Sequence, residues 1–327
     1  MKVTNLYPEL LELEREVNAF LAEWNDKSPY IRVQTSGSTG NPKTITVSKD
    51  RMRVSAKMTG SFFGFRKGQK ALLCLSPKYI AGKMMVVRAI EFELELLLGK
   101  IESVPYNGEV EVDFAAMVPM QVEKSLEKNV PLNQVGHLII GGAPISKRLK
   151  EKLLQVDSNI YATFGMTETL SHIALAKLSG NEFRYRCLPG VRISTNNNSC
   201  LRIECASLLE EPIQTNDIVE IFNEKEFEWR GRADFVINSG GIKIHPEEIE
   251  FQLKGVLDCD LMVFGEPDEV LGSRLALILE SKDTVDCELA FSKLGKFQVP
   301  KKVYAVREFS RTKTGKINRL KTIEKCL

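Results

Sequence analysis

One short segment combines the residue types that bind polyphosphate in proteins. Residues 35–43 read TSGSTGNPK, so hydroxyl groups and glycines precede a lysine. Glycines let the backbone approach a ligand closely, and main-chain N–H groups, hydroxyls and an ammonium can then surround phosphate oxygens. The segment lacks the GxxxxGK[ST] spacing of a Walker A loop. By itself it also fits a plain surface hairpin. The phosphate-binding candidates are Thr35, Ser36, Gly37, Ser38, Thr39, Gly40 and Lys43.

The elements around this segment have the pattern of a layered fold. Alternating residues at 31–34 and 44–47 predict a strand on each side of it. Further along, predicted strands run into glycine turns or prolines and then helices, at 71–76, 114–119, 137–140 and 160–163. This repetition predicts an α/β fold with ligands at the carboxyl ends of the strands.

The two ends of the chain differ from this middle part. Residues 8–24 have apolar side chains at helical spacing, which predicts an amphipathic helix packed on the body of the protein. From about residue 183, short alternating segments predict a β-rich region. After Asp234 comes a glycine turn and a helix starting near Pro246, followed by further strands. We predict a large layered α/β domain with a β-rich end over residues 1–233, and a small α+β domain over 234–327.

Composition excludes several classes of protein. The 327 residues carry a net charge of +2, which gives no reason to expect a nucleic-acid partner. No apolar run approaches the roughly 18 residues of a membrane-spanning helix, so we expect no membrane insertion. The seven cysteines show no CxxC pair, and the N-terminus has no secretory pattern. We therefore expect a cytoplasmic protein with reduced thiols.

Five short segments, taken in their order along the chain, resemble the motifs of a known family. They are TSGSTGNPK (35–43), GGAP (141–144), FGMTE (164–168), GRADFVINSGGIKIHPEEIE (231–250) and SRTKTGK (310–316). Together they resemble the adenylate-forming superfamily, which includes acyl-CoA synthetases, adenylation domains of peptide synthetases and luciferases. The resemblance covers residues 34–320 and implies ATP, Mg²⁺ and coenzyme A as cofactors or co-substrates, with a small-molecule carboxylic acid as the other partner.

The resemblance also implies roles for individual residues. Residues 36–43 would hold the β- and γ-phosphates of ATP. Thr167 would lie near the α-phosphate, and Glu168 would bind Mg²⁺, whose preferred ligands are hard oxygens. The residues expected around the nucleoside are Gly141, Gly142 and Ala143 along the adenine, Phe164 and Gly165 at the base, and Asp217 and Arg232 at the ribose.

The resemblance makes Lys316 the expected catalytic cation. The acid is already ionised at pH 7, so its reaction with the α-phosphate needs positive charge between two anions and no general base. Asp234 matches the hinge about which the small domain would rotate, which makes that domain mobile. The glycine turn Ser239, Gly240 and Gly241 would then approach the pantetheine chain of CoA.

The sequence departs from the family pattern at several places. Thr44 and Asn216 replace usual glycines, and Ile80 stands where many relatives have histidine, with Lys83 as a candidate cation nearby. The phosphate segment also begins near residue 35, so most of the usual first subdomain is expected to be missing. Either the helix at 8–24 or a homodimer contact would then seal the core.

A narrower resemblance concerns the acid. Residues 74–89, 216–221 and 238–250 resemble the short o-succinylbenzoate–CoA ligases of menaquinone biosynthesis. The alternatives are a ligase for another aromatic or medium-chain acid, a carrier thiol in place of CoA, and a nucleotide-binding protein without turnover. The acid pocket is expected to draw on residues 76–90, 137–145 and 161–175.

Overall fold

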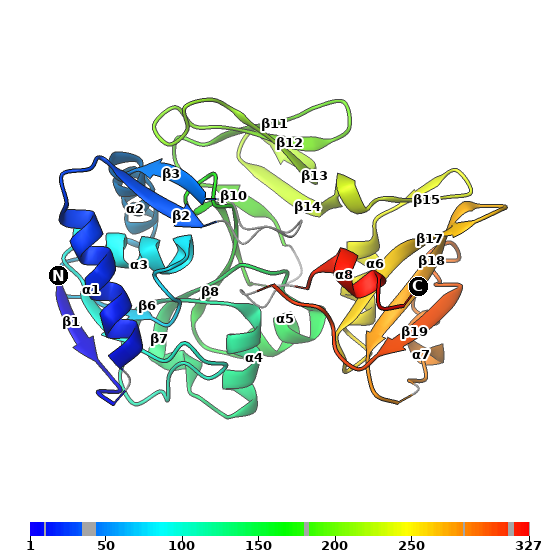
Figure 1. Cartoon of the computed structure of the whole chain (residues 1–327), viewed down its shortest axis with the longest axis horizontal. Coiled ribbons are helices and arrows are strands. Elements are labelled where there is room, and N and C mark those ends of the chain that lie inside the picture. Colours follow the sequence, from blue (N-terminus) through cyan, green and yellow to red (C-terminus); the bar gives the residue numbers. More distant parts are fainter. Residues whose placement is uncertain (10, 35–43, 180–182, 284, 313–316, 327) are drawn as a thin grey trace.

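The fold is built on one large mixed sheet. The structure is a computed structural model that describes residues 1–9, 11–34, 44–179, 183–283, 285–312 and 317–326. Twelve strands form the large sheet in the order β1-β5-β4-β6-β7-β8-β9-β10-β14-β13-β12-β11 (Figure 1). The first six strands in this order pair in parallel, and the pairs from β8–β9 onward are antiparallel. The predicted α/β class is confirmed.

Alternate residues of the parallel strands point to two separate cores. Leu73, Leu98 and Phe114 belong to one core, whereas their neighbours Leu72, Leu97 and Ala115 belong to the other. Strands buried on both faces read as nearly continuous apolar runs, as these do. The parallel strands are β1 (Lys2–Asn5), β4 (Lys70–Leu73), β5 (Glu95–Leu98), β6 (Val112–Met117), β7 (Val135–Ile140) and β8 (Asn159–Gly165).

Helices supply the cover on each face. The first core is closed by α1 (Leu11–Asn25), α2 (Lys49–Phe63) and α3 (Ile80–Glu91). The second is closed by α4 (Pro119–Glu127) and α5 (Lys147–Leu153), with η1 (Leu132–Gln134) beside them. As predicted, α1 packs on the body of the protein, and it buries Leu13, Val17, Phe20 and Trp24.

The antiparallel half confirms the predicted β-rich region and adds one unpredicted strand. Its strands are β9 (His172–Lys177), β10 (Tyr185–Cys187), β11 (Arg192–Thr195), β12 (Cys200–Glu204), β13 (Ile213–Asn223) and β14 (Glu226–Arg232). We did not predict β9, whose first five residues are all buried and therefore do not alternate. A separate hairpin of β2 (Tyr30–Gln34) and β3 (Thr44–Ser48) pairs Gln34 with Thr44, directly beside the candidate phosphate segment.

A second, smaller sheet follows in the last third of the chain. It orders its strands β17-β18-β19, and its two cores draw only on residues from Ile237 onward among those described. Figure 1 shows this part on the right, beyond the end of β14. Its elements are η2 (Ala233–Phe235), β15 (Ile237–Ser239), β16 (Ile242–Ile244), α6 (Pro246–Leu253), β17 (Leu261–Asp268), β18 (Gly272–Glu280), α7 (Glu288–Phe291), β19 (Lys302–Val306) and α8 (Arg319–Ile323).

Candidate active site

Two of the predicted nucleotide segments lie side by side at one edge of the sheet. Residues 141–143 follow β7, and residues 164–168 end β8 and continue beyond it. Because β7 and β8 are parallel neighbours that pair Ile140 with Ala162, their carboxyl ends meet at the same edge. Gly141 is required here, since a Cβ on it would stand 2.1 Å from the Thr163 hydroxyl.

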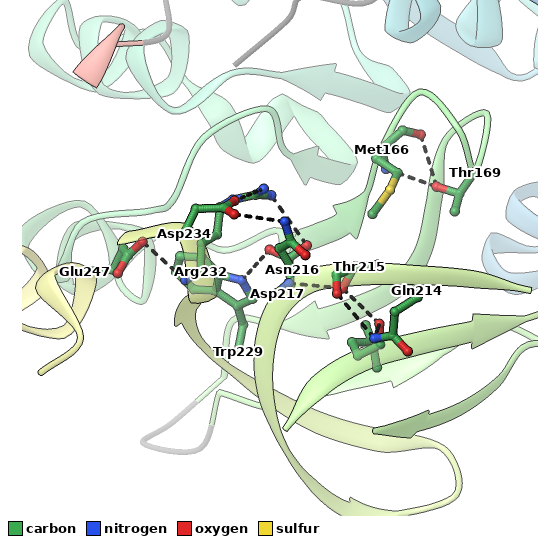
Figure 2. Close-up of polar contacts among 11 residues, drawn as sticks. Met166, Thr169, Gln214, Thr215, Asn216, Asp217, Trp229, Arg232, Asp234 and Glu247 are labelled. Atoms are coloured by element: carbon green, nitrogen blue, oxygen red, sulfur yellow. Dashed lines mark hydrogen bonds and ion pairs between the residues drawn. The ribbon is translucent and has the colours of Figure 1, made fainter. Parts of the chain in front are cut away.

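A buried threonine shapes the turn that carries Thr167 and Glu168. The Thr169 hydroxyl accepts the Met166 N–H at 3.0 Å and lies 3.0 Å from the Met166 carbonyl (Figure 2). It also lies 2.8 Å from the Ser171 carbonyl. This closes the turn, so that Thr167 is half-buried and Glu168 is exposed. The exposed carboxylate could bind a cation whose other ligands are phosphate oxygens and water molecules. We did not single out Thr169 from the sequence.

Phe164 lies at the rim of an aromatic cluster. Its ring packs edge-on against Phe227 and Tyr185, with centroids 5.1 and 5.6 Å apart. The side chain is half-buried, so part of the ring remains accessible. Tyr185 and Phe227 hold the Phe164 ring in place, and its accessible part could stack on a flat base. The stacking role itself stays a prediction.

Asp217 is a buried carboxylate with a dedicated donor. Its Oδ1 accepts the indole N–H of Trp229 at 2.9 Å, and its own N–H donates to the Thr215 hydroxyl at 3.0 Å (Figure 2). Arg232, its partner across β13 and β14, lies 3.8 Å from Oδ2. Burial raises the pKa of Asp217, and the Trp229 bond and the Arg232 charge oppose that rise. The indole of Trp229 thus orients the Asp217 carboxylate, whose remaining lone pairs can accept further hydrogen bonds.

Asp234 lies at the junction between the two sheets. Its carboxylate accepts from Asn216 Nδ2 at 2.9 Å and from Arg232 Nη2 at 2.6 Å. Glu247 of α6 accepts the Arg232 N–H at 3.3 Å, and Arg148 of α5 forms an ion pair with Asp258. These contacts connect the last third of the chain to the large sheet in this arrangement.

The glycine turn predicted to meet CoA is the tip of a hairpin. Gly240 and Gly241 have φ of +58° and +86°, which a residue with a side chain rarely adopts, and they connect Ser239 of β15 to β16. The Gly240 N–H donates to the Leu271 carbonyl at 2.9 Å. Figure 1 shows β15 running from the end of β14 along the small sheet.

Two groups of predicted residues lie outside the described part of the chain. One is the phosphate segment Thr35, Ser36, Gly37, Ser38, Thr39, Gly40 and Lys43, and the other contains Lys316. Their assignments stay predictions.

The candidate cation Lys83 already has a partner. Its ammonium lies 3.1 Å from a carboxylate oxygen of Glu23 and 4.5 Å from the centre of the Phe20 ring, both on α1. The side chain is almost fully buried. It therefore fixes α1 to α3, which argues against the acid-binding role we considered for it.

Arg88 is a buried cation that we did not single out from the sequence. It is 2% exposed, donates from Nη2 to the Ser171 hydroxyl at 2.6 Å, and has no carboxylate partner among the residues described. Its Nε lacks any partner within the same part of the chain. Burial lowers its pKa to about 9. A buried arginine costs free energy unless an anion pairs with it.

Two further features are absent from the residues described. They contain no cluster of three or more histidine, cysteine, aspartate or glutamate side chains arranged to hold a metal ion. The helices they form include none with both the length and the apolar character needed to cross a bilayer.

The α/β fold and the family match place the chain among adenylate-forming enzymes. Residues 11–194 match the family described as AMP-binding enzyme, and the chain belongs to that family. The 2-succinylbenzoate–CoA ligase of Listeria monocytogenes is 26% identical over 358 aligned residues, which cover 98% of this chain and 75% of that protein.

Solved structures show the same likeness. An acyl-CoA synthetase (AMP-forming)/AMP-acid ligase II-like protein from Dyadobacter fermentans is 35% identical, with a TM-score of 0.65, and the match covers 96% of this chain and 94% of that one. The o-succinylbenzoate CoA synthetase of Bacillus subtilis, in complex with ATP and magnesium, shares the fold at 19% identity and a TM-score of 0.79. That match covers 89% of this chain and 69% of that one.

Proposed function

We propose that this chain is an ATP-dependent carboxylic acid–CoA ligase, and that o-succinylbenzoate is its acid. The proposal rests on membership of the AMP-binding enzyme family. The observation that carries it is the meeting of residues 141–143 and 164–168 at the carboxyl edge of β7 and β8. The names of several relatives support the choice of acid.

The first step joins two anions. A carboxylate oxygen of the acid attacks the α-phosphorus of ATP, and pyrophosphate leaves. We assign residues 35–43 to the β- and γ-phosphates, Thr167 to the α-phosphate and Glu168 to the Mg²⁺ that arrives with ATP. Lys316 supplies positive charge between the reacting anions, which is the main requirement of phosphoryl chemistry with an ionised nucleophile.

The nucleoside contacts follow from the described side chains. Gly141, Gly142 and Ala143 would line the adenine, with Phe164 and Gly165 at its face. Asp217 would accept from the ribose hydroxyls, because its carboxylate is held by Trp229 and keeps unused lone pairs. Arg232 would add a second ribose contact.

In the second step the thiolate of CoA attacks the acyl carbon, and AMP leaves. Lys316 and the thiol need the same space at different times, so we propose that residues 234–327 rotate as a domain about Asp234 against residues 1–233. The turn Ser239–Gly241 then reaches the pantetheine chain.

Arg88 supports an acid with two carboxylates. One carboxylate of o-succinylbenzoate reacts, and the other would enter the protein as an unpaired anion. A buried guanidinium without a carboxylate partner in the described structure offers the matching charge. Arg88 and Ser171 both fall inside the segments predicted to form the acid pocket.

A panel of acids tests the function. We expect pyrophosphate release from ATP with o-succinylbenzoate, acyl-CoA formation when CoA is present, and much weaker activity with acids of one carboxylate. Arg88→Met should remove most of the preference for the dicarboxylate. If no acid in the panel releases pyrophosphate, the ligase proposal is wrong. Activity with monocarboxylates alone would overturn only the choice of acid.

Two further assignments remain predictions. A cytoplasmic location is supported by the composition of the chain, and a homodimer contact was proposed as one way to seal the core. Because α1 buries four apolar side chains in the first core, the core at that position is covered within one chain.

A further inference from the structure

Four side chains from three elements form a continuous buried polar chain. Arg88 of α3 donates to the Ser171 hydroxyl at 2.6 Å, and that hydroxyl lies 3.3 Å from His172 Nδ1. At the other side of the ring, His172 Nε2 lies 3.2 Å from the Thr59 hydroxyl of α2. Thr59 also lies 3.2 Å from the Ser55 carbonyl. Thr59, His172 and Arg88 are all more than nine-tenths buried.

One set of proton positions gives every donor in this hydrogen-bond chain an acceptor inside it. Arginine has donors alone, so the Ser171 oxygen must accept from Arg88, and the Ser171 hydrogen is left to point at His172 Nδ1. Nδ1 is therefore the acceptor, and the ring hydrogen of neutral His172 sits on Nε2. Nε2–H donates to Thr59, whose own hydrogen goes to the Ser55 carbonyl. Each hydroxyl donates once and accepts once.

The other states of His172 conflict with its surroundings. With the hydrogen on Nδ1, Arg88 and His172 would both donate to the Ser171 oxygen, and the Ser171 hydrogen would lose the acceptor that Nδ1 offers in this hydrogen-bond chain. A protonated ring would place a second buried cation near Arg88. Burial and the Arg88 charge lower the pKa of His172 well below its ordinary value, so the ring is neutral.

The direction of these hydrogen bonds determines which nitrogens of Arg88 remain available to a ligand. Nη2 is engaged by Ser171, whereas Nε has no partner among the described residues. We propose that His172 and Thr59 are positioning residues: they hold the Ser171 hydroxyl with its hydrogen toward Nδ1 and a lone pair toward Arg88, and thereby orient Arg88 for the second carboxylate of the acid. This inference rests on the proposed function, because it takes the anion at Arg88 to be part of the substrate.

Substitutions at Thr59 test the role with a matched control. Thr59→Val keeps the shape and removes the acceptor for Nε2–H, whereas Thr59→Ser keeps the hydroxyl. We expect Thr59→Val to raise KM for o-succinylbenzoate by about fivefold to tenfold, as the loss of one buried hydrogen bond would do. KM for ATP, and KM for the analogue that keeps only the reacting carboxylate, should not change. Thr59→Ser should restore the wild-type KM.

Equal increases in KM for o-succinylbenzoate and for that analogue would mean a general packing defect and would overturn the positioning role. So would wild-type values for Thr59→Val.

A spectroscopic test requires no substitution. The chain has three histidines, so the imidazole nitrogens can be resolved by ¹⁵N NMR of the full-length protein. We expect His172 to show a protonated Nε2 and an unprotonated Nδ1 at pH 7. Protonation on Nδ1 would overturn the inference even if the enzyme activates o-succinylbenzoate. If wild-type enzyme fails to activate that acid, the proposed function fails instead, and the NMR result still reports on the hydrogen-bond chain.

Discussion

The indole of Trp229 donates to the carboxylate of Asp217 at 2.9 Å, across the paired strands β13 and β14. The guanidinium of Arg232 is farther from that carboxylate, at 3.8 Å, and lies closer to Asp234, at 2.6 Å. The Asp217 carboxylate, which we propose binds the ribose, is therefore oriented by a neutral donor. The Arg232 guanidinium beside it is directed toward Asp234, the proposed hinge residue. One side chain, Arg232, thus connects the proposed ribose carboxylate to the proposed hinge residue.

This relationship predicts an effect of Trp229→Phe on ATP binding. Without the indole N–H, the Asp217 carboxylate loses its closest side-chain donor, and its pKa should rise further because burial is then less opposed. We expect KM for ATP to rise about tenfold, with a smaller change in KM for the acid. Trp24→Phe is the matched control, since the only other tryptophan lies on α1. An unchanged KM for ATP would exclude a role for Trp229 in holding Asp217.

Lys316→Ala should separate the two half-reactions. Removal of a charge that acts in the transition state typically costs about 100- to 1,000-fold in rate. Adenylation, followed as acid-dependent pyrophosphate release, should fall by at least this much. Thioester formation from preformed acyl-adenylate should be far less affected. An equal loss in both half-reactions would contradict the assignment and indicate a folding defect.

Asp234→Pro should restrict the proposed rotation. Proline fixes φ, and a hinge residue must absorb a large change in backbone angles. We expect adenylation to persist while CoA thioester formation falls steeply. Asp234→Asn is the control, because it keeps backbone freedom while removing the charge that contacts Arg232. If Asp234→Pro leaves both half-reactions near wild type, the rotation occurs elsewhere or is not required.

The raised pKa of Glu247 predicts that the stability of the fold depends on pH. Its Oε1 accepts the Arg232 N–H, its Oε2 is buried without a partner in the described structure, and burial raises its pKa to about 7. The unfolded chain has an ordinary glutamate pKa near 4.3. The folded state therefore binds the proton more tightly, and this contribution to stability is present at low pH and lost as pH rises through about 7.

Glu247→Gln should remove this contribution. We expect the Tm of the wild type to fall between about pH 5 and pH 8, and the Tm of the variant to change less over the same range. Glu248→Gln, in the same helical turn, should keep the wild-type slope. Identical slopes for wild type and Glu247→Gln would show that the carboxyl does not titrate in this range.

Sequence patterns predicted the local elements well where periodicity was clear. The helix over residues 8–24 appears as α1 with Leu13, Val17 and Trp24 buried as its spacing indicates. The strand expected over 71–76 ends earlier, at Leu73, because the chain turns there toward α3. Strand β9 was missed because burial on both faces removes the alternation that marks a strand.

The family resemblance was readable from the linear chain, since it depends on the order of short segments such as residues 35–43 and 164–168. Only the tertiary structure placed Trp229 against Asp217, Lys83 against Glu23, and His172 between Thr59 and Ser171. The contact between Thr59 and His172 and the contact between Arg88 and Ser171 each join residues more than 80 positions apart in the chain. The physical reason is that burial removes competing water, so a polar side chain must bond to whichever partner the fold brings within reach, and sequence spacing does not specify that partner.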